Sequence, residues 1–201
     1  MEILEIKDLE TLAKKRVPKM FFDYVNSGSW TETTYNENVS DFQKIKLRQR
    51  VAIDMSNRTL ETKMINQPVS MPVAIAPTGL TGMQRADGEI LAAQAAEEFG
   101  IPYTLSTMSV CSIEAVAEKT KRPFWFQLYV MKDKKFMERL IDRAKEAKCS
   151  ALVLTLDLQL LGQRHKDLRN GLSTPPKLIP KHIYQVLTRP MWCLRMLTTK
   201  N

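Results

Sequence analysis

Four short apolar runs in this chain end in residues that can donate or accept hydrogen bonds. The residues that follow or close these runs are Ala76-Pro77-Thr78-Gly79, then Ser106, then Gln127 with Tyr129, and then Thr155. Hydroxyl, amide and phenol groups at such positions can bind the polar edge of a flat cofactor or a small anion. The runs recur roughly every 22 to 30 residues, and amphipathic helical stretches fill the gaps, which is typical of βα units.

The elements that must position these groups are parallel strands. Strands are expected near residues 72–76, 103–106, 124–128 and 151–156. In a (β/α)8 barrel the carboxyl ends of the strands meet at one face and build the active site. A closed barrel has eight units and usually needs about 250 residues, whereas this chain has four clear units in 201 residues. The pattern therefore predicts an α/β fold with about four βα units, fewer than the eight of a (β/α)8 TIM barrel.

Helical periodicity surrounds and precedes these strands. Helices are expected at residues 6–15, 19–26, 88–99, 112–119 and 134–147. Asp8 is expected to N-cap the first helix, and Pro18 to open the second. Residues 30–50 are predicted to be irregular with one helical turn. Residues 51–71 are predicted to form short strands or an extended cover over the barrel mouth, and residues 162–180 a long loop.

One domain is expected over residues 1–201. It divides into a helical and irregular lead-in at 1–70, the βα units at 71–160, and an active-site loop with a basic tail at 161–201. The chain is 44% hydrophobic and 26% charged, which is enough apolar surface to bury a core. No apolar run approaches the about 20 residues of a membrane span, and the acidic start Met1–Glu5 does not resemble a signal peptide.

The three cysteines, Cys111, Cys149 and Cys193, form no close-spaced pair. The absence of a close-spaced pair predicts no metal site, and an odd count is a poor disulfide framework. A reducing, cytoplasmic compartment is the simplest interpretation.

The formal net charge of +8 concentrates partly in the tail. No motif that reads DNA or RNA accompanies it, so nucleic acid is not expected as a partner. Residues 183–197 mix Arg with Leu, Met and Trp, which favours peripheral contact with an anionic membrane surface. The alternative is a loop and helix that pack on parts of the fold outside these 201 residues.

Six motifs, in this order and spacing, resemble one protein family. They are Pro18-Lys19-Met20-Phe21-Phe22-Asp23-Tyr24, Ser70-Met71-Pro72 through Ala76-Pro77-Thr78-Gly79, Leu105-Ser106-Thr107, Trp125-Phe126-Gln127-Leu128-Tyr129-Val130, Thr155-Leu156-Asp157 and Leu161-Gly162-Gln163-Arg164. The chain resembles the FMN-dependent 2-hydroxy acid dehydrogenases and oxidases from about Ile6 to its last residue. The stretches at 105–111 and 122–126 favour the branch of the bacterial L-lactate dehydrogenases over the plant-type glycolate oxidases.

The resemblance implies FMN as cofactor and a small 2-hydroxy acid, L-lactate, as substrate. The residues that it implies for FMN binding are Ala76, Pro77, Thr78, Gly79, Ser106, Gln127 and Thr155. It implies that Tyr24, Tyr129 and Arg164 face the substrate, since phenols and a guanidinium fork suit a carboxylate. Without the resemblance, the strand-end groups could merely satisfy backbone atoms, Tyr24 could be a core aromatic and Arg164 a solvated loop charge. Asp157 could cap the sheet or belong to the site.

The family's catalytic base is expected outside this chain. Family members use a His followed shortly by an Arg, with a preceding Lys near the flavin, and all three lie beyond Asn201. The phosphate-binding part is expected there too. His165 and His182 match no family base, so no catalytic residue is expected within these 201 residues. Leu158-Gln159 and Gln163 also depart from the family pattern.

Two readings from different classes follow. In the first, the chain is the N-terminal half of the (β/α)8 TIM barrel of an FMN-dependent L-lactate dehydrogenase, from a truncated or split gene. It then works only with the missing C-terminal half, which a split gene encodes separately, and alone it is expected to be inactive. In the second, it is a non-catalytic remnant that at most binds flavin weakly, or binds another protein through its exposed half-barrel edge. A homo-oligomer is compatible with either reading.

Overall fold

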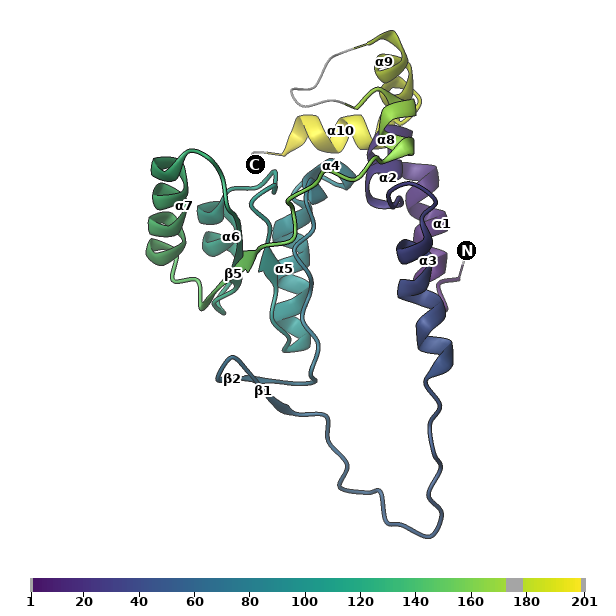
Figure 1. Cartoon of the computed structure of the whole chain (residues 1–201), viewed down its shortest axis with the longest axis vertical. Coiled ribbons are helices and arrows are strands. Elements are labelled where there is room, and N and C mark those ends of the chain that lie inside the picture. Colours follow the sequence, from purple (N-terminus) through teal and green to yellow (C-terminus); the bar gives the residue numbers. More distant parts are fainter. Residues whose placement is uncertain (1, 173–178, 200–201) are drawn as a thin grey trace. The chain divides into compact units, whose positions relative to one another are not determined.

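The computed structural model describes residues 2–172 and 179–199, and these form two compact units (Figure 1). The first combines the residues up to Arg58 with Leu160–Leu197, and its described elements are helices. We call it the helical unit. The second comprises Thr59–Gln159 with residues 198 and 199, and it holds the parallel strands. We call it the sheet unit.

The sheet unit contains the parallel sheet that the sequence predicts. Its strands are β3 (Thr104–Leu105), β4 (Trp125–Tyr129) and β5 (Ala151–Thr155), in the order β3-β4-β5 and parallel throughout. Near residues 72–76 the expected strand is reduced to one parallel bridge between Ile75 and Tyr103. Sequence order and spatial order agree, as consecutive βα units require.

An antiparallel hairpin precedes the parallel strands. It pairs β1 (Thr62–Met64) with β2 (Gln67–Val69), as expected for short strands within residues 51–71. Its two turn residues, Ile65 and Asn66, both have positive φ, which gives a turn whose twist matches that of the strands.

Helices cover one face of the parallel sheet and form the core with it. They are α5 (Gly88–Phe99), α6 (Ile113–Lys119) and α7 (Lys134–Glu146), close to the predicted bounds, with α4 (Thr81–Gln84) as an unpredicted extra turn. Ser112 and Asp133 cap α6 and α7 by accepting backbone N–H groups. The core joins residues of the strands to residues of the helices, among them Leu105, Phe126, Leu128, Ile90, Val116 and Leu140.

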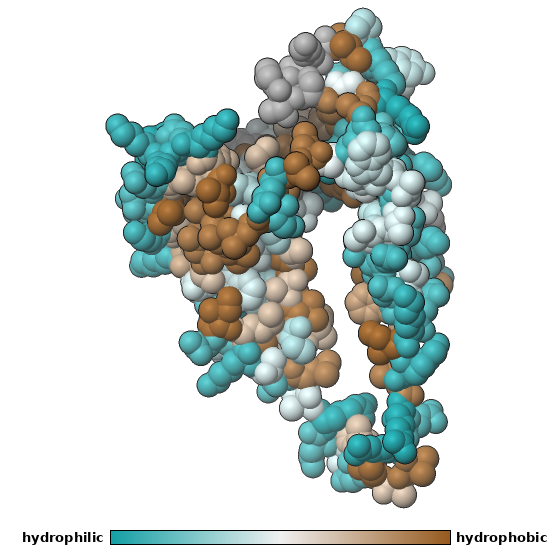
Figure 2. Space-filling model, in the orientation of Figure 1, coloured by the Kyte–Doolittle hydropathy of each residue, from teal (hydrophilic) through white to brown (hydrophobic). Residues whose placement is uncertain are grey.

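The outer strand of the sheet is less covered. Leu152 and Leu154 of β5 pair in register with the buried Phe126 and Leu128, yet they are 48% and 49% exposed. Figure 2, in the same orientation as Figure 1, shows apolar residues clustered around the position of β5. In the described part of the chain, β5 pairs only with β4, so its other edge carries unpaired backbone groups.

The helical unit is built from segments at both ends of the chain. Its elements are α1 (Ile6–Arg16), α2 (Lys19–Val25), α3 (Thr33–Ser40), the 3-10 helix η1 (Asp41–Lys44), α8 (His165–Asn170), α9 (Pro180–Leu187) and α10 (Pro190–Thr198). The prediction that Asp8 is an N-cap is wrong. Asp8 lies inside the first turn and reaches back to the backbone N–H groups of Leu4 and Glu5, at 2.9 and 3.1 Å.

Two segments contain more helix than the sequence predicts. Residues 30–50 hold α3 and η1 rather than one turn, and the expected long loop at 162–180 contains α8. Helix α8 is held by contacts that local periodicity does not show: the Asn170 side chain donates to Asp23 Oδ2 at 2.6 Å. It ends at Gly171, whose φ of +73° is the left-handed conformation of a helix C-terminus. Residues 173–178 of that loop lie outside the described part of the chain.

Candidate functional site

The predicted site residues of the sheet unit lie toward the carboxyl ends of the parallel strands. Gln127 is the central residue of β4 and Tyr129 is its last, and Tyr129 pairs in register with Thr155 at the end of β5. Ser106 follows the last residue of β3 directly. The expectation that Tyr129 and Thr155 share one end of the sheet is therefore confirmed.

A hydrogen-bonded row crosses the three strand ends. Ser106 Oγ donates to Gln127 Oε1 at 3.3 Å, and Gln127 Nε2 donates to Thr155 Oγ1 at 2.7 Å. Ser106 and Gln127 are buried, with 2% and 1% of their surface exposed, whereas Thr155 is half-buried. The row therefore leads from the interior of the sheet to a partly open group at Thr155.

The row has a defined direction because a backbone donor fixes the amide. The N–H of Thr107 donates to Gln127 Oε1 at 3.2 Å, so this atom is the oxygen and the amide nitrogen faces Thr155. Nε2 then keeps a second hydrogen, and Thr155 keeps its hydroxyl hydrogen, with no acceptor among the described residues. Donors of this kind suit the carbonyl oxygens on the pyrimidine edge of a flavin, so the donor set fits FMN.

The segment Ala76-Pro77-Thr78-Gly79 follows the Ile75 bridge on the same side. Ala76, Pro77 and Thr78 are exposed and Gly79 is half-buried. The next residue, Leu80, donates its N–H to the carbonyl of Met108 at 2.9 Å, which joins this segment to the loop after β3. Exposed backbone next to the polar row is what a flat ring needs to approach closely.

Tyr129 is half-buried at the end of β4. Its backbone N–H donates to Thr107 Oγ1 at 3.3 Å, while its phenol hydroxyl has no hydrogen-bond partner in the described residues. The phenol can therefore donate to a ligand oxygen.

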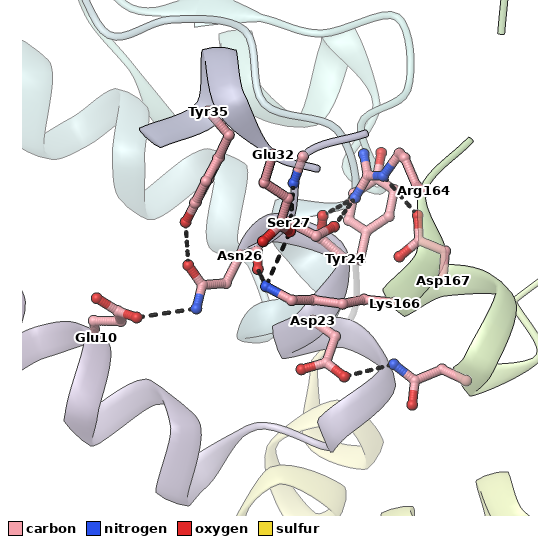
Figure 3. Close-up of polar contacts among 12 residues, drawn as sticks. Glu10, Asp23, Tyr24, Asn26, Ser27, Glu32, Tyr35, Arg164, Lys166 and Asp167 are labelled. Carbon is pink, nitrogen blue, oxygen red and sulfur yellow. Dashed lines mark hydrogen bonds and ion pairs between the residues drawn. The ribbon is translucent and has the colours of Figure 1, made fainter. Parts of the chain in front are cut away.

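Tyr24 and Arg164 contact each other within the helical unit (Figure 3). The Arg164 guanidinium donates to the Tyr24 carbonyl and, at 2.9 Å, to Ser27 Oγ. Its Cζ lies 4.7 Å from the centre of the Tyr24 ring, and its Nε lies 2.7 Å from Asp167 Oδ2. Arg164 is therefore a paired, partly buried cation and not a solvated loop charge. Burial raises the pKa of the Asp167 carboxyl, although the charge of Arg164 opposes this.

A second set of polar contacts fixes the turn after α2 against α8 (Figure 3). Lys166 donates to the Asn26 carbonyl at 2.7 Å and lies 3.2 Å from Glu32 Oε1. The N–H of Gly28 also donates to Glu32, and these hydrogen bonds lower the pKa of the Glu32 carboxyl. The turn that follows Tyr24 is thus held by Lys166 of α8 and by Glu32, the residue before α3.

His165 and His182 both lie in the helical unit, away from the strand ends in sequence. His182 is buried, and its Nε2 lies 2.7 Å from the Asn170 carbonyl oxygen. The ring of His165 packs edge-on against Trp30, with 5.8 Å between the ring centres. These contacts give both rings structural roles.

Two residues that the sequence analysis assigned no role are part of the site's framework. Thr107 bonds to both Gln127 and Tyr129. Glu89 is fully buried, and its Oε1 accepts the N–H of Val110 at 2.9 Å, which holds the loop after β3 against α5. Glu89 stands on the same helix face as the buried Ala93 and Ala96. A lone carboxylate on that apolar face was the signal available in the sequence.

Cys111, which neighbours Glu89, is expected to be an unreactive thiol. Burial, together with the neighbouring Glu89 carboxyl, raises the pKa of Cys111 to about 12. The side chain therefore stays a thiol near neutral pH.

Over residues 2–172 and 179–199, no group of three or more His, Cys, Asp or Glu residues is placed to hold a metal ion. None of the helices in those ranges is long and apolar enough to cross a membrane.

Comparison with known proteins identifies relatives along nearly the whole chain. Residues 13–201 match the FMN-dependent dehydrogenase family. An L-lactate dehydrogenase of Acinetobacter baylyi is 46% identical over 192 residues, which cover 96% of this chain and 50% of that protein. The chain therefore spans about half the length of this curated relative.

Solved structures of similar sequence superpose on nearly the whole chain as well. A monotopic membrane protein, (S)-mandelate dehydrogenase, superposes with a TM-score of 0.90 at 32% identity, over 98% of this chain and 52% of the other. A soluble mutant of the membrane-associated (S)-mandelate dehydrogenase from Pseudomonas putida superposes with a TM-score of 0.81 at 35% identity, over 90% and 52% of the two chains.

Proposed function

The chain belongs to the FMN-dependent dehydrogenase family, and we propose that it takes part in the oxidation of a small L-2-hydroxy acid, L-lactate, to pyruvate. The observation that carries the proposal is the row of Ser106, Gln127 and Thr155, which presents donors beside the exposed Ala76–Gly79 segment. The identity of 46% to an L-lactate dehydrogenase supports the choice of lactate.

The sheet unit would hold the flavin. Gln127 and Thr155 would donate to its pyrimidine edge, Ser106 holds Gln127 by a hydrogen bond, and the backbone of Ala76–Gly79 would contact the ring. FMN, when bound, accepts the hydride from the 2-carbon of the substrate. Tyr129, whose hydroxyl is unpaired in the described residues, donates to the substrate and steadies the oxygen that becomes the keto group.

Tyr24 and Arg164 would bind the carboxylate of the substrate. A guanidinium presents several donors in one plane, and Arg164 uses some of them to hold the Tyr24 backbone and Ser27. The contact between the Arg164 guanidinium and the Tyr24 ring orders the Tyr24 phenol, so that both side chains would bind the same carboxylate.

The substrate's hydroxyl proton needs a base, and we propose that residues outside these 201 supply it. His182 is committed to the Asn170 carbonyl, and His165 packs on Trp30. The chain spans 50% of its L-lactate dehydrogenase relative, which leaves room for a base and a phosphate site in the remainder.

Complementation tests this proposal. The chain is mixed with FMN and with the part of the A. baylyi relative that it does not match, and L-lactate-dependent reduction of a dye is measured. We expect reduction from the mixture, none from either part alone, and none with D-lactate. Reduction by the chain with FMN alone would contradict the need for a second part. A folded mixture that neither quenches FMN fluorescence nor oxidises lactate would contradict the function itself.

A second candidate is a non-catalytic role through association with another chain. The half-exposed Leu152 and Leu154 and the free edge of β5 favour it, because an apolar strand edge invites pairing. Under this proposal the mixture described above would associate without oxidising lactate. The same edge serves the first proposal, in which its partner completes the barrel.

We also propose peripheral contact with an anionic membrane through α9 and α10. Their exposed apolar side chains are Ile183, Leu187, Met191, Leu194 and Leu197, and Lys181, Arg189 and Arg195 lie in or beside the same helices. Such a surface binds by apolar burial together with attraction to anionic lipid. We expect the chain to sediment with vesicles containing phosphatidylglycerol and to be released by replacing Leu194 and Leu197 with Ser. Equal sedimentation of that variant would contradict the contact.

A further inference from the structure

Thr107 occupies the place where the pairing of β3 with β4 stops. In the paired part, the N–H of Trp125 donates to the Tyr103 carbonyl at 2.8 Å, and the register runs through Leu105 and Phe126. The bonds of a parallel ladder are evenly spaced, and alternate residues of one strand bond to the flanking residues of the other. Continued by that rule, the backbone of residue 107 would bond to the carbonyl of Gln127 and the N–H of Tyr129.

The side chain of Thr107 makes both of these bonds instead. Its hydroxyl donates to the Gln127 carbonyl at 2.5 Å and accepts the N–H of Tyr129 at 3.3 Å. One hydroxyl, which is both donor and acceptor, thus replaces an N–H and a carbonyl of the ladder. The backbone N–H of Thr107 is thereby released, and it donates to Gln127 Oε1 at 3.2 Å.

This arrangement sets two groups at once. The backbone N–H fixes the Gln127 amide with its nitrogen toward Thr155, and the hydroxyl holds the end of β4 from which the Tyr129 side chain projects. From this geometry we infer that Thr107 is a positioning residue for two side chains together: the amide of Gln127, which serves the cofactor, and the phenol of Tyr129, which serves the substrate. The inference rests on the proposed function of Gln127 and Tyr129 and adds the residue that orients them.

The test compares three variants of the full 201-residue chain. Thr107→Val keeps the shape but removes the hydroxyl, Thr107→Ser restores the hydroxyl, and Thr107→Ala serves where the Val variant does not fold. Thr120→Val is the matched control, because it removes a hydroxyl that donates to a backbone carbonyl, that of Val116 at 3.0 Å, at the far end of α6.

The first measurement is hydrogen exchange at the Tyr129 amide, which needs no flavin. We expect exchange about tenfold faster in Thr107→Val, since a lost hydrogen bond of this kind changes the opening equilibrium by about that factor, and exchange near the wild-type rate in Thr107→Ser and Thr120→Val. Wild-type exchange at Tyr129 in both Thr107→Val and Thr107→Ala would overturn the inference.

The second measurement is FMN binding in the complemented mixture, followed by flavin fluorescence and visible absorbance. We expect Thr107→Val to weaken FMN binding several-fold and to shift the flavin spectrum, with rescue by Thr107→Ser. Unchanged affinity and spectrum, with altered exchange at Tyr129, would overturn the link to the cofactor. If the wild-type mixture binds no FMN, the proposed function fails, and the exchange rate at Tyr129 alone decides whether Thr107 holds the strand end.

Discussion

Replacing Gln127 by Leu is expected to weaken FMN binding at least about tenfold and to lower the free energy of unfolding of the sheet unit by about 2–4 kcal/mol. Gln127 is 1% exposed and bonds to Ser106, Thr107 and Thr155. Leu has a similar volume, so the loss comes from polar groups left without partners. The buried Ser106 hydroxyl and the partly buried backbone N–H of Thr107 both lose the oxygen that accepts from them, and a donor left without an acceptor keeps its desolvation cost.

The two effects are measured separately. FMN fluorescence quenching in the complemented mixture gives the affinity, and urea unfolding of the isolated chain followed by circular dichroism gives the stability. Gln94→Leu is the matched control, because Gln94 bonds to one exposed carbonyl, that of Lys119, at 3.0 Å. Equal FMN affinity in Gln127→Leu and Gln94→Leu would show that the strand-end amide does not contact the flavin.

Gln127 also shows how far sequence reasoning reaches in this protein. A polar residue inside an apolar run marks a strand end, and parallel strands from βα units bring such ends to one edge. That argument predicted the location of Ser106, Gln127, Tyr129 and Thr155. It could not predict Thr107, because its role depends on where the β3–β4 ladder stops, and pairing between strands is a non-local property.

The helical unit was harder to predict for a related reason. Helix α8 lies in a segment rich in polar residues with no apolar stripe, and it forms against α2 through Asn170 and Asp23, which are far apart in sequence. Arg164 likewise meets the Tyr24 backbone across 140 residues. Pattern along the chain carries no information on such pairs, so only the family resemblance linked Tyr24 with Arg164.

Replacing Tyr129 by Phe is expected to lower the turnover of the complemented enzyme by about tenfold to about a hundredfold, while FMN stays bound. The phenol hydroxyl has no partner in the described residues, so its removal leaves the sheet unit intact and deletes one hydrogen bond to the substrate. Losing a partner of a buried oxygen on which charge develops raises the barrier by about 1.4–2.7 kcal/mol, and each 1.4 kcal/mol lowers the rate about tenfold. Turnover is measured as dye reduction at saturating L-lactate, with Tyr184→Phe as the control, because Tyr184 is 70% exposed.

Arg164→Lys should behave differently, because the charge remains while the planar fork is lost. In the complemented enzyme it is expected to raise the lactate concentration needed for half-maximal rate. It should also lower the melting temperature, since Arg164 also bonds to the Tyr24 carbonyl and to Ser27. A Tyr129→Phe enzyme with unchanged turnover would remove Tyr129 from the substrate site. An Arg164→Lys enzyme that melts earlier but has unchanged lactate dependence would leave Arg164 as a structural tie between α2 and α8. The two variants thus separate a side chain that acts on the substrate from one that only holds the fold.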